Sequence, residues 1–174
     1  MRGPAPAGAA GAIVIGSDYR ALGVVRSLGR HGIPVLVLRD DHILANWSRY
    51  CRGSFPWPRA GHAGLARYLL DLARDHGLQG WALYPTEDET AAVLARNSEA
   101  LSERYRVTTP QWDVLRWAYD KRLTYRLAAE VGVDHPRTLY PKNREDVLGF
   151  DGRFPAILKP AIRAELNRFT MSKA

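Results

Sequence analysis

The stretch from Ala12 to Asp41, AIVIGSDYRALGVVRSLGRHGIPVLVLRDD, constrains the fold more than any other part of the chain. It contains a short apolar run, a glycine, a segment with apolar residues at helical spacing, and a second continuous apolar run. Strands that are apolar on both faces are typical of parallel sheets covered by helices, and a helix that joins two parallel strands forms a right-handed crossover. The stretch therefore predicts a βαβ unit at the start of an α/β domain.

The alternation of strand and helix patterns continues to about residue 110. Further strands are expected near 50–55, at 81–85 and at 105–110, and helices over 62–77 and after Pro85. Thr86, followed three residues later by Glu89, matches a capping box at the start of the second of these helices. The region 11–110 is therefore predicted to be one Rossmann-like domain, a parallel sheet with helices on both faces.

The sequence changes character after residue 110. Two helices are expected to meet near Tyr119 and Asp120, and an extended proline-containing stretch follows them, so 111–141 is interpreted as linker helices. In the final part, 142–174, we expect a short helix and then an apolar strand over 154–158 that leads into Lys159. The first ten residues, which are small and rich in Gly and Pro, are expected to form a flexible tail.

Composition narrows the range of partners. The chain has 25 Lys and Arg against 18 Asp and Glu, and such a basic balance attracts nucleic acid, anionic membranes or phosphorylated small molecules. The arginines are spread singly and the five tryptophans are interpreted as packing residues, so no nucleic-acid partner is predicted. No apolar segment is long enough to span a bilayer. Cys51, the single cysteine, has no disulfide partner, which favours a reducing compartment and the cytoplasm.

The turn at Gly16 suggests a dinucleotide-binding reading, in which a glycine-rich turn and a helix start hold a pyrophosphate. The segment GSDYRALG lacks the central glycine of that fingerprint, and Asp18 would place a negative charge against the phosphates. Asp40 or Asp41, after the second strand, is nevertheless placed where an acid binds ribose in such folds. A stand-alone Rossmann-like nucleotide- or dinucleotide-binding domain therefore stays open as an alternative, as does an interaction or regulatory module with a basic surface.

Two lysines suggest a different chemistry. A lysine at the end of an apolar strand, as expected for Lys159, is costly to bury unless an anion meets it. The phosphates of ATP are such an anion. Lys121, near the start of a predicted helix, provides a second cation that could approach the same phosphates.

The order of these segments resembles the ATP-grasp superfamily, particularly its carboxylate–amine ligases. The resemblance is carried by AIVIGSDYRALGVVRSLGRHGIPVLVL, NWSRYCR, YPTEDE, the DK pair with GVDHPRT, and FPAILKPA, and it extends from Ala12 to the C-terminus. It implies that 11–110 is a pre-ATP-grasp domain. The residues after it would lead into the small lobe of the ATP-grasp domain, which would be incomplete in this chain.

The resemblance also implies site residues. Lys121 and Lys159 would contact ATP phosphates, and two loops facing the cleft would contact substrate, through Gly16, Ser17 and Asp18 and through Thr86, Glu87 and Asp88. In a complete enzyme of this family, ATP with Mg²⁺ phosphorylates a small-molecule carboxylate to an acylphosphate and leaves as ADP, and an amine then attacks the acyl carbon and displaces phosphate.

The family's metal ligands come from the second half of the grasp domain, so no metal ligand and no catalytic residue is assigned to this chain. We therefore expect the chain alone to be inactive and to bind ATP only weakly. Weak order is expected over 164–174, and self-association is expected through the lobe face left uncovered.

Overall fold

The computed structural model describes residues 10–58, 62–152 and 154–162. The chain divides into two compact units, 1–116 and 117–174, which are described separately. The flexible tail expected at the N-terminus, apart from residue 10, and the weakly ordered segment expected at 164–174 lie outside the described residues.

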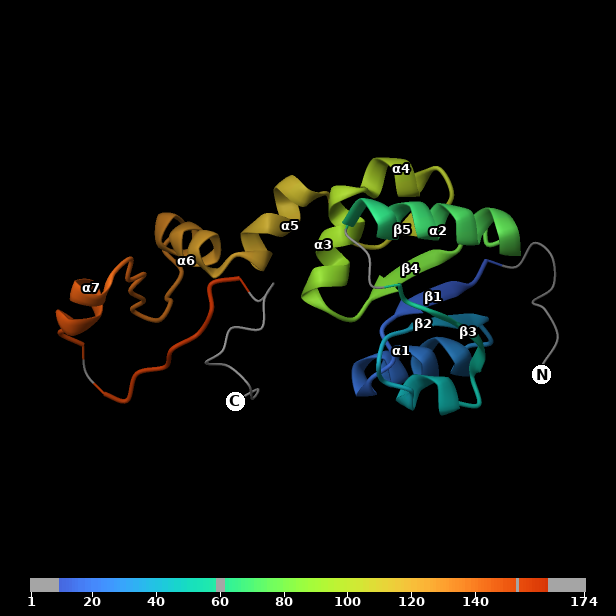
Figure 1. Ribbon diagram of the computed structural model, residues 1–174, viewed down its shortest axis with the longest axis horizontal. Coiled ribbons are helices and arrows are strands. Elements are labelled where there is room, and N and C mark those ends of the chain that lie inside the picture. The colour runs from blue at the N-terminus through green and yellow to red at the C-terminus, as the bar shows by residue number, and fades with distance from the viewer. Residues whose placement is uncertain (1–9, 59–61, 153, 163–174) are drawn as a thin grey trace. The chain divides into compact units, whose positions relative to one another are not determined.

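The first unit is built on a five-stranded sheet with the order β3-β2-β1-β4-β5 (Figure 1). Its strands are β1 (Ala12–Ile15), β2 (Val35–Arg39), β3 (Cys51–Pro56), β4 (Ala82–Pro85) and β5 (Arg106–Val107). Every strand pair is parallel, and β1 lies at the centre between β2 and β4. The α/β class and the parallel sheet predicted from the sequence are therefore confirmed.

Helices cover both faces of this sheet, as Figure 1 shows. They are α1 (Tyr19–Arg30) and the 3-10 helix η1 (Leu44–Trp47) on one face, and α2 (His62–His76), α3 (Asp88–Arg96) and α4 (Ser98–Ser102) on the other. Side chains of β1 alternate between the two layers: Val14 packs with Val25 of α1, while Ile13 and Ile15 pack with Leu69 of α2. A central strand that is buried on both faces explains the continuous apolar run in the sequence.

The predicted capping box does not form. The residue that precedes α3 is Glu87, whose side chain makes no capping hydrogen bond. The Thr86 hydroxyl instead donates to the carbonyl oxygen of Ile15, at 2.8 Å, because the loop after β4 lies against the end of β1. The spacing matches a local motif, but in the structure the Thr86 hydroxyl pairs with the neighbouring strand instead.

The second unit contains no buried helix among its described residues. Helix α5 (Trp112–Tyr119) crosses the boundary between the units, and α6 (Lys121–Glu130) and α7 (Arg144–Leu148) follow. Asp120 separates α5 from α6, as predicted, and its side chain accepts a hydrogen bond from the backbone N–H of Arg122 at 2.9 Å.

The strand predicted over 154–158 is wrong. The segment is irregular, and Phe154, Ile157 and Leu158 are 81%, 77% and 85% exposed. A strand needs a partner for its backbone groups, and no described residue pairs with this segment. Pro155 and Pro160 further reduce its capacity to pair, because proline lacks a backbone N–H.

Candidate functional site at the carboxyl ends of β1 and β4

The candidate site lies where the strand order of the sheet reverses. From β1 the chain continues into β2 on one side, whereas β4 pairs with β1 on the other side. The register aligns Ile15 with Pro85, so the loops 16–18 and 86–88 leave the sheet next to each other. Open parallel sheets bind ligands at this reversal point, outside the carboxyl ends of the strands. The six residues predicted to contact substrate therefore lie at the position where the fold favours a ligand.

Gly16 and Thr86 fix the two loops against each other. Gly16 has a φ of +111°, and a Cβ at this position would lie 2.2 Å from Thr86 Oγ1. The backbone N–H of Thr86 also donates to the Ile15 carbonyl oxygen, at 3.1 Å. The close approach of the loops therefore requires glycine at residue 16, both for its backbone conformation and for the space.

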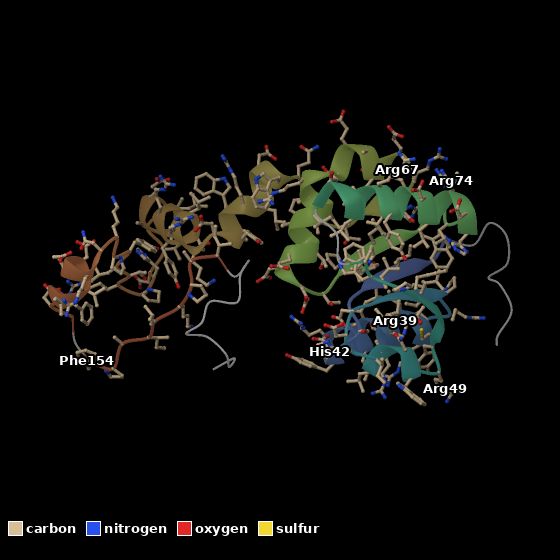
Figure 2. The ribbon with its side chains drawn as sticks, in the orientation of Figure 1. Arg39, His42, Arg49, Arg67, Arg74 and Phe154 are labelled. Atoms are coloured by element: carbon tan, nitrogen blue, oxygen red, sulfur yellow. The ribbon has the colours of Figure 1, made fainter. Side chains whose placement is uncertain are left out.

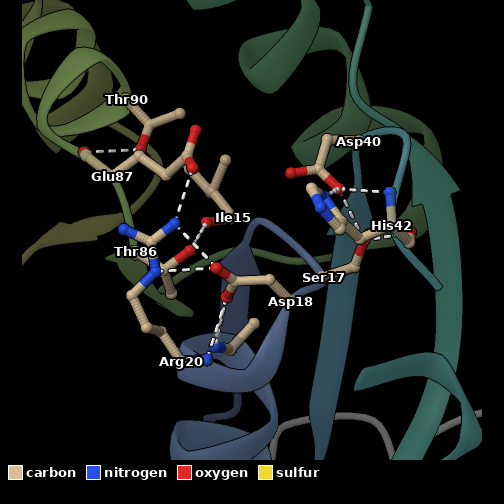
Figure 3. Close-up of polar contacts among 10 residues, drawn as sticks. Ile15, Ser17, Asp18, Arg20, Asp40, His42, Thr86, Glu87 and Thr90 are labelled. Atoms are coloured by element: carbon tan, nitrogen blue, oxygen red, sulfur yellow. Dashed lines mark hydrogen bonds and ion pairs between the residues drawn. The ribbon is translucent and has the colours of Figure 1, made fainter. Parts of the chain in front are cut away.

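Asp18 forms the N-cap of α1 and binds Arg20, as Figure 3 shows (Figure 3). Its Oδ1 accepts hydrogen bonds from the backbone N–H groups of Arg20 and Ala21, at 2.9 and 3.2 Å. The Arg20 guanidinium lies 2.7 Å from Asp18 Oδ2 and 2.7 Å from Glu87 Oε1. Burial raises the pKa of Asp18, but the hydrogen bonds from Arg20 and the two backbone N–H groups outweigh it, so the pKa lies below its usual value.

This arrangement disfavours the binding of a dinucleotide at the start of α1. A pyrophosphate at the start of α1 would need the free backbone N–H groups of the first turn and a positive local field. The Asp18 carboxylate already accepts from two of those N–H groups and brings a negative charge. The geometry therefore shows the N-terminus of α1 serving as a capped helix end.

Ser17, Asp40 and His42 form a second polar cluster beside the first. Ser17 is fully buried, and its hydroxyl donates to Asp40 Oδ1 at 2.8 Å and lies against the His42 carbonyl oxygen. Asp40 Oδ1 also accepts from the His42 backbone N–H at 2.8 Å. Burial raises the pKa of Asp40, but the His42 N–H and the Ser17 hydroxyl bring it below its usual value. Asp40 therefore holds the loop after β2 onto the loop after β1.

Three residues with accessible polar groups at this edge are Arg20, Glu87 and His42, whose side chains are 34%, 44% and 65% exposed. Glu87 is one of the residues that the resemblance to ATP-grasp enzymes predicted to contact substrate. The sequence did not point to Arg20 or His42, because nothing in their immediate neighbourhood distinguishes them from solvated residues. Their shared position follows only from the pairing of β1 with β2 and β4.

Lys121 and Lys159 both belong to the second unit. The backbone N–H of Lys121 donates to the carbonyl oxygen of Ala161 at 3.2 Å, so the segment that contains Lys159 returns to the start of α6. Lys159 is exposed, which contradicts the expectation of a lysine buried at a strand end. Because Lys159 is not buried, the cost of burying a charge gives no reason to expect an anion beside it. Any role of Lys159 in ATP binding must rest on other grounds.

Within the described ranges, no three His, Cys, Asp or Glu residues are grouped closely enough to hold a metal ion. The same part of the chain has no helix that combines the length and the apolar character needed to cross a bilayer.

Comparison with known proteins adds to the fold. No family model matches the sequence, and no curated protein gives a significant match. Among solved structures, the L-amino acid ligase from Bacillus licheniformis matches with a TM-score of 0.53 and 13% sequence identity. The match covers 72% of this chain and 31% of the ligase, so the chain spans about a third of that protein's length.

Two weaker matches are biotin carboxylase domains. The domain of the Hydrogenobacter thermophilus 2-oxoglutarate carboxylase, solved with MgADP, ADP and bicarbonate, matches with a TM-score of 0.47 and 18% identity, over 70% of this chain and 27% of its own. The domain of a single-chain bacterial carboxylase matches with a TM-score of 0.49 and 17% identity, over 79% of this chain and 33% of its own.

The comparison with the ligase shows a shared fold. The described part of the chain shares with it an α/β architecture in which a five-stranded parallel sheet is flanked by helices. The resemblance to ATP-grasp enzymes expected from the sequence is thus confirmed at the level of the fold.

Proposed function

We propose that this chain is the N-terminal portion of a cytoplasmic, ATP-dependent ligase that joins a carboxylate to an amine. In this proposal 11–110 is the pre-ATP-grasp domain, 111–141 provides linker helices, and 142–174 begins the ATP-binding lobe. The observation that carries the proposal is the adjacency of the loops after β1 and β4 at the strand-order reversal, in a sheet whose fold matches that of a ligase.

We propose that an amino acid binds as substrate at this edge of the sheet. Amino acids are the substrate class in the name of the matching ligase. An amino acid carries a carboxylate and an ammonium group, so a complementary site needs charges of both signs. The exposed side of the Arg20 guanidinium offers donors to the carboxylate, and Glu87 with Asp88 offers acceptors to the ammonium. Gly16, Ser17 and Thr86 would act by holding these loops in place, because their polar groups are already committed to the backbone or to neighbouring side chains.

ATP, when bound in the complete enzyme, would supply the phosphoryl group that activates the carboxylate. Two observations fit a role for the lysines in holding its phosphates. The segments of Lys121 and Lys159 meet through the hydrogen bond between Lys121 N and Ala161 O, and the Lys159 ammonium is accessible. The described residues contain no group of three His, Cys, Asp or Glu side chains that could hold a metal ion, so we assign no Mg²⁺ ligand in this part of the chain.

Titration of the isotopically labelled chain with L-amino acids, followed by amide chemical shifts, tests the substrate proposal. We expect millimolar affinity, because one wall of a site supplies only part of the binding free energy. Shifts should concentrate in 16–20 and 86–90. Arg20→Gln should weaken binding of an amino acid several-fold, while a simple amine should bind the variant and the parent equally.

Arg67→Gln is the matched control, because Arg67 is an exposed arginine of α2 whose ion pair with Asp71, at 3.2 Å, lies outside the candidate loops. This variant should bind amino acids like the parent. Equal weakening by both substitutions, or shifts confined to other parts of the chain, would contradict the proposed substrate contacts.

A separate titration with Mg-ATP tests the lysines. We expect weak binding with amide shifts at the start of α6 and near residue 159, and these shifts should be lost in the Lys121→Ala, Lys159→Ala double variant. Arg126→Ala, which removes one exposed cation from the same helix α6, serves as a control for loss of positive charge elsewhere on the helix. Equal loss with the control would indicate a non-specific charge effect and would contradict the assigned role of the lysines.

A further inference from the structure

A cavity of about 450 Å³ opens on the α1 face of the first unit. It is lined by Arg26 and Arg30 of α1, Trp47 of η1, and Ser48, Arg49 and Tyr50, which lead into β3. Figure 2 shows Arg49 on the side of the sheet that carries α1 (Figure 2). None of these residues belongs to the loops 16–18 and 86–88 or to the cluster of Ser17, Asp40 and His42, so the cavity is separate from the candidate substrate site. Its volume is in the range of small-molecule sites.

The lining carries three guanidinium groups and no carboxylate. Arg26 and Arg30 are four residues apart on one helix, so their side chains share a face and repel each other. Arg49 adds a third positive charge from the segment after η1. In the part of the chain that the structure describes, no ion pair to a carboxylate offsets any of the three. Converging, uncompensated guanidinium groups favour an anion, above all a phosphate, which they bind through paired hydrogen bonds.

Trp47 provides a flat apolar surface at the same cavity. Its side chain is 80% exposed, although tryptophan usually buries most of its large surface. This exposure contradicts the interpretation of Trp47 as a residue packed in the core of the domain. An exposed indole beside arginines can stack on the planar ring of a ligand whose charged end the arginines hold.

Close packing and hydrogen bonds position the segment 47–50 beside α1. Gly29 of α1 allows Tyr50 to lie directly on the helix, because a Cβ at residue 29 would lie 2.3 Å from Tyr50 Cβ. The Tyr50 N–H donates to Ser48 Oγ at 3.3 Å, and the Ser48 N–H donates to the Ala45 carbonyl oxygen at 3.2 Å. Arg49 extends over the Tyr50 ring, with its guanidinium carbon 5.7 Å from the ring centroid. Hydrogen bonds and the packing of Tyr50 on α1 therefore hold the segment that presents Trp47 and Arg49.

We propose that this cavity binds a nucleoside phosphate, with the base stacked on Trp47 and the phosphate held by Arg26, Arg30 and Arg49. A free nucleotide fits better than a nucleic-acid strand, because the three arginines gather at one hollow. Proteins that bind single strands instead spread their cations along a groove of about 4 to 16 nucleotides. The inference is independent of the proposed ligase function, since it uses neither the loops at the strand ends nor the two lysines.

Calorimetric titration of the chain with ADP, pyrophosphate, adenosine and a single-stranded ten-base oligonucleotide tests the proposal. We expect ADP to bind most tightly. The Arg26→Gln, Arg30→Gln double variant should weaken ADP and pyrophosphate alike, by about tenfold or more. Trp47→Ala should weaken ADP by about tenfold and leave pyrophosphate unchanged, because only ADP has a ring to stack.

Two controls keep this site distinct from the ATP site proposed at Lys121 and Lys159. Arg67→Gln removes one charge from the other face of the sheet and should leave ADP binding unchanged. The Lys121→Ala, Lys159→Ala variant should also retain ADP binding at the cavity. Circular dichroism of each variant should match the parent, and amide shifts of 26–30 and 47–50 on addition of ADP should locate the site.

Three results would overturn the proposal. One is the absence of ADP binding at millimolar concentration. Another is ADP binding that survives the arginine double variant and disappears with the lysine variant. The third is oligonucleotide binding that is much tighter than ADP binding and grows with strand length, which would identify a nucleic-acid surface.

Discussion

Arg20 and Glu87, which are 67 positions apart in the sequence, form an ion pair of 2.7 Å between the first turn of α1 and the loop after β4. The same guanidinium binds Asp18, the N-cap of α1. Arg20 therefore connects the two loops that meet at the strand-order reversal of the sheet. A substitution at Arg20 should therefore alter the contacts of both loops, whether or not a ligand is present.

Substitution of Arg20 tests this connection. Arg20→Gln should lower the free energy of unfolding by about 1 kcal/mol, because Asp18 loses a charged partner but keeps its two backbone hydrogen bonds. Arg67→Gln, which breaks an exposed pair within α2, should cost less than about 0.5 kcal/mol. Urea unfolding measures both values, and an equal cost would show that the Arg20 pairs contribute no more than an ordinary surface pair.

Gly16 and Gly23 form a matched pair of glycines with opposite expected effects. Gly16→Ala should destabilise the fold by roughly 1–3 kcal/mol, because φ is +111° and the new Cβ would collide with Thr86 Oγ1. Gly23 is an exposed helical residue, and a Cβ added there would meet no atom within 4 Å, so Gly23→Ala should stabilise by about 0.5–1 kcal/mol. Thermal unfolding of the two variants gives the signs directly. Stabilisation by Gly16→Ala would mean that the loop contact is not as described.

Asp18 should stabilise α1 as a cap. Asp18→Ala should cost about 1 kcal/mol, because two backbone N–H groups of the first turn lose their acceptor. Asp18→Asn keeps an oxygen acceptor, so it should recover most of this loss. Chemical denaturation at neutral pH compares the three proteins, and equal stability of the alanine and asparagine variants would argue against a capping role.

The Asp18 charge also predicts a pH dependence. Burial raises the pKa of Asp18, but the bonds from Arg20 and the backbone N–H groups make the net shift downward. A carboxyl whose pKa is lower in the folded state contributes stability above its unfolded pKa of about 3.9, and loses it as the pH falls through the folded value. The stability difference between the parent and Asp18→Asn should therefore be constant near neutral pH and shrink below about pH 4. A difference that grows on acidification would contradict the direction of the shift.

The sheet could be predicted from the sequence because its strands carry their own signal. The apolar runs of β1 and β2 indicate burial on both faces, and the connection of parallel strands follows general rules of handedness. The loops 16–18 and 86–88 were predicted as substrate contacts only through the resemblance to ATP-grasp enzymes. The contacts that organise those loops could not be predicted, because Arg20 meets Glu87 only after β1 and β4 have paired.

The wrong or missing sequence predictions have the same physical cause, namely their dependence on contacts between distant parts of the chain. The apolar segment 154–158 has the composition of a strand, but a strand exists only with a partner, and the described residues provide none. The arginines at 26, 30 and 49 are dispersed in the sequence, and they converge because η1 turns the chain back onto α1. Local sequence patterns therefore predict helices and strands well. They predict poorly the contacts between residues that are far apart in the sequence.

The second unit leads to a prediction of self-association. Phe154, Ile157 and Leu158 lie close in sequence and are each more than three-quarters exposed, at 81%, 77% and 85%. Exposed apolar clusters tend to associate, and the effect is insensitive to salt, whereas association through the basic surface would weaken as salt is added. Light scattering should show a mass that rises with protein concentration and persists at high salt.

The Phe154→Ser, Ile157→Ser, Leu158→Ser variant separates the two causes of association. It should stay monomeric over the concentration range in which the parent associates, because the apolar area that drives association has been removed. Val114→Ser changes a single apolar residue of α5 that is 59% exposed. It should leave the association unchanged, since isolated apolar residues are normal on protein surfaces. A parent that is monomeric throughout, or a triple variant that associates like the parent, would show that this segment does not mediate contacts between molecules.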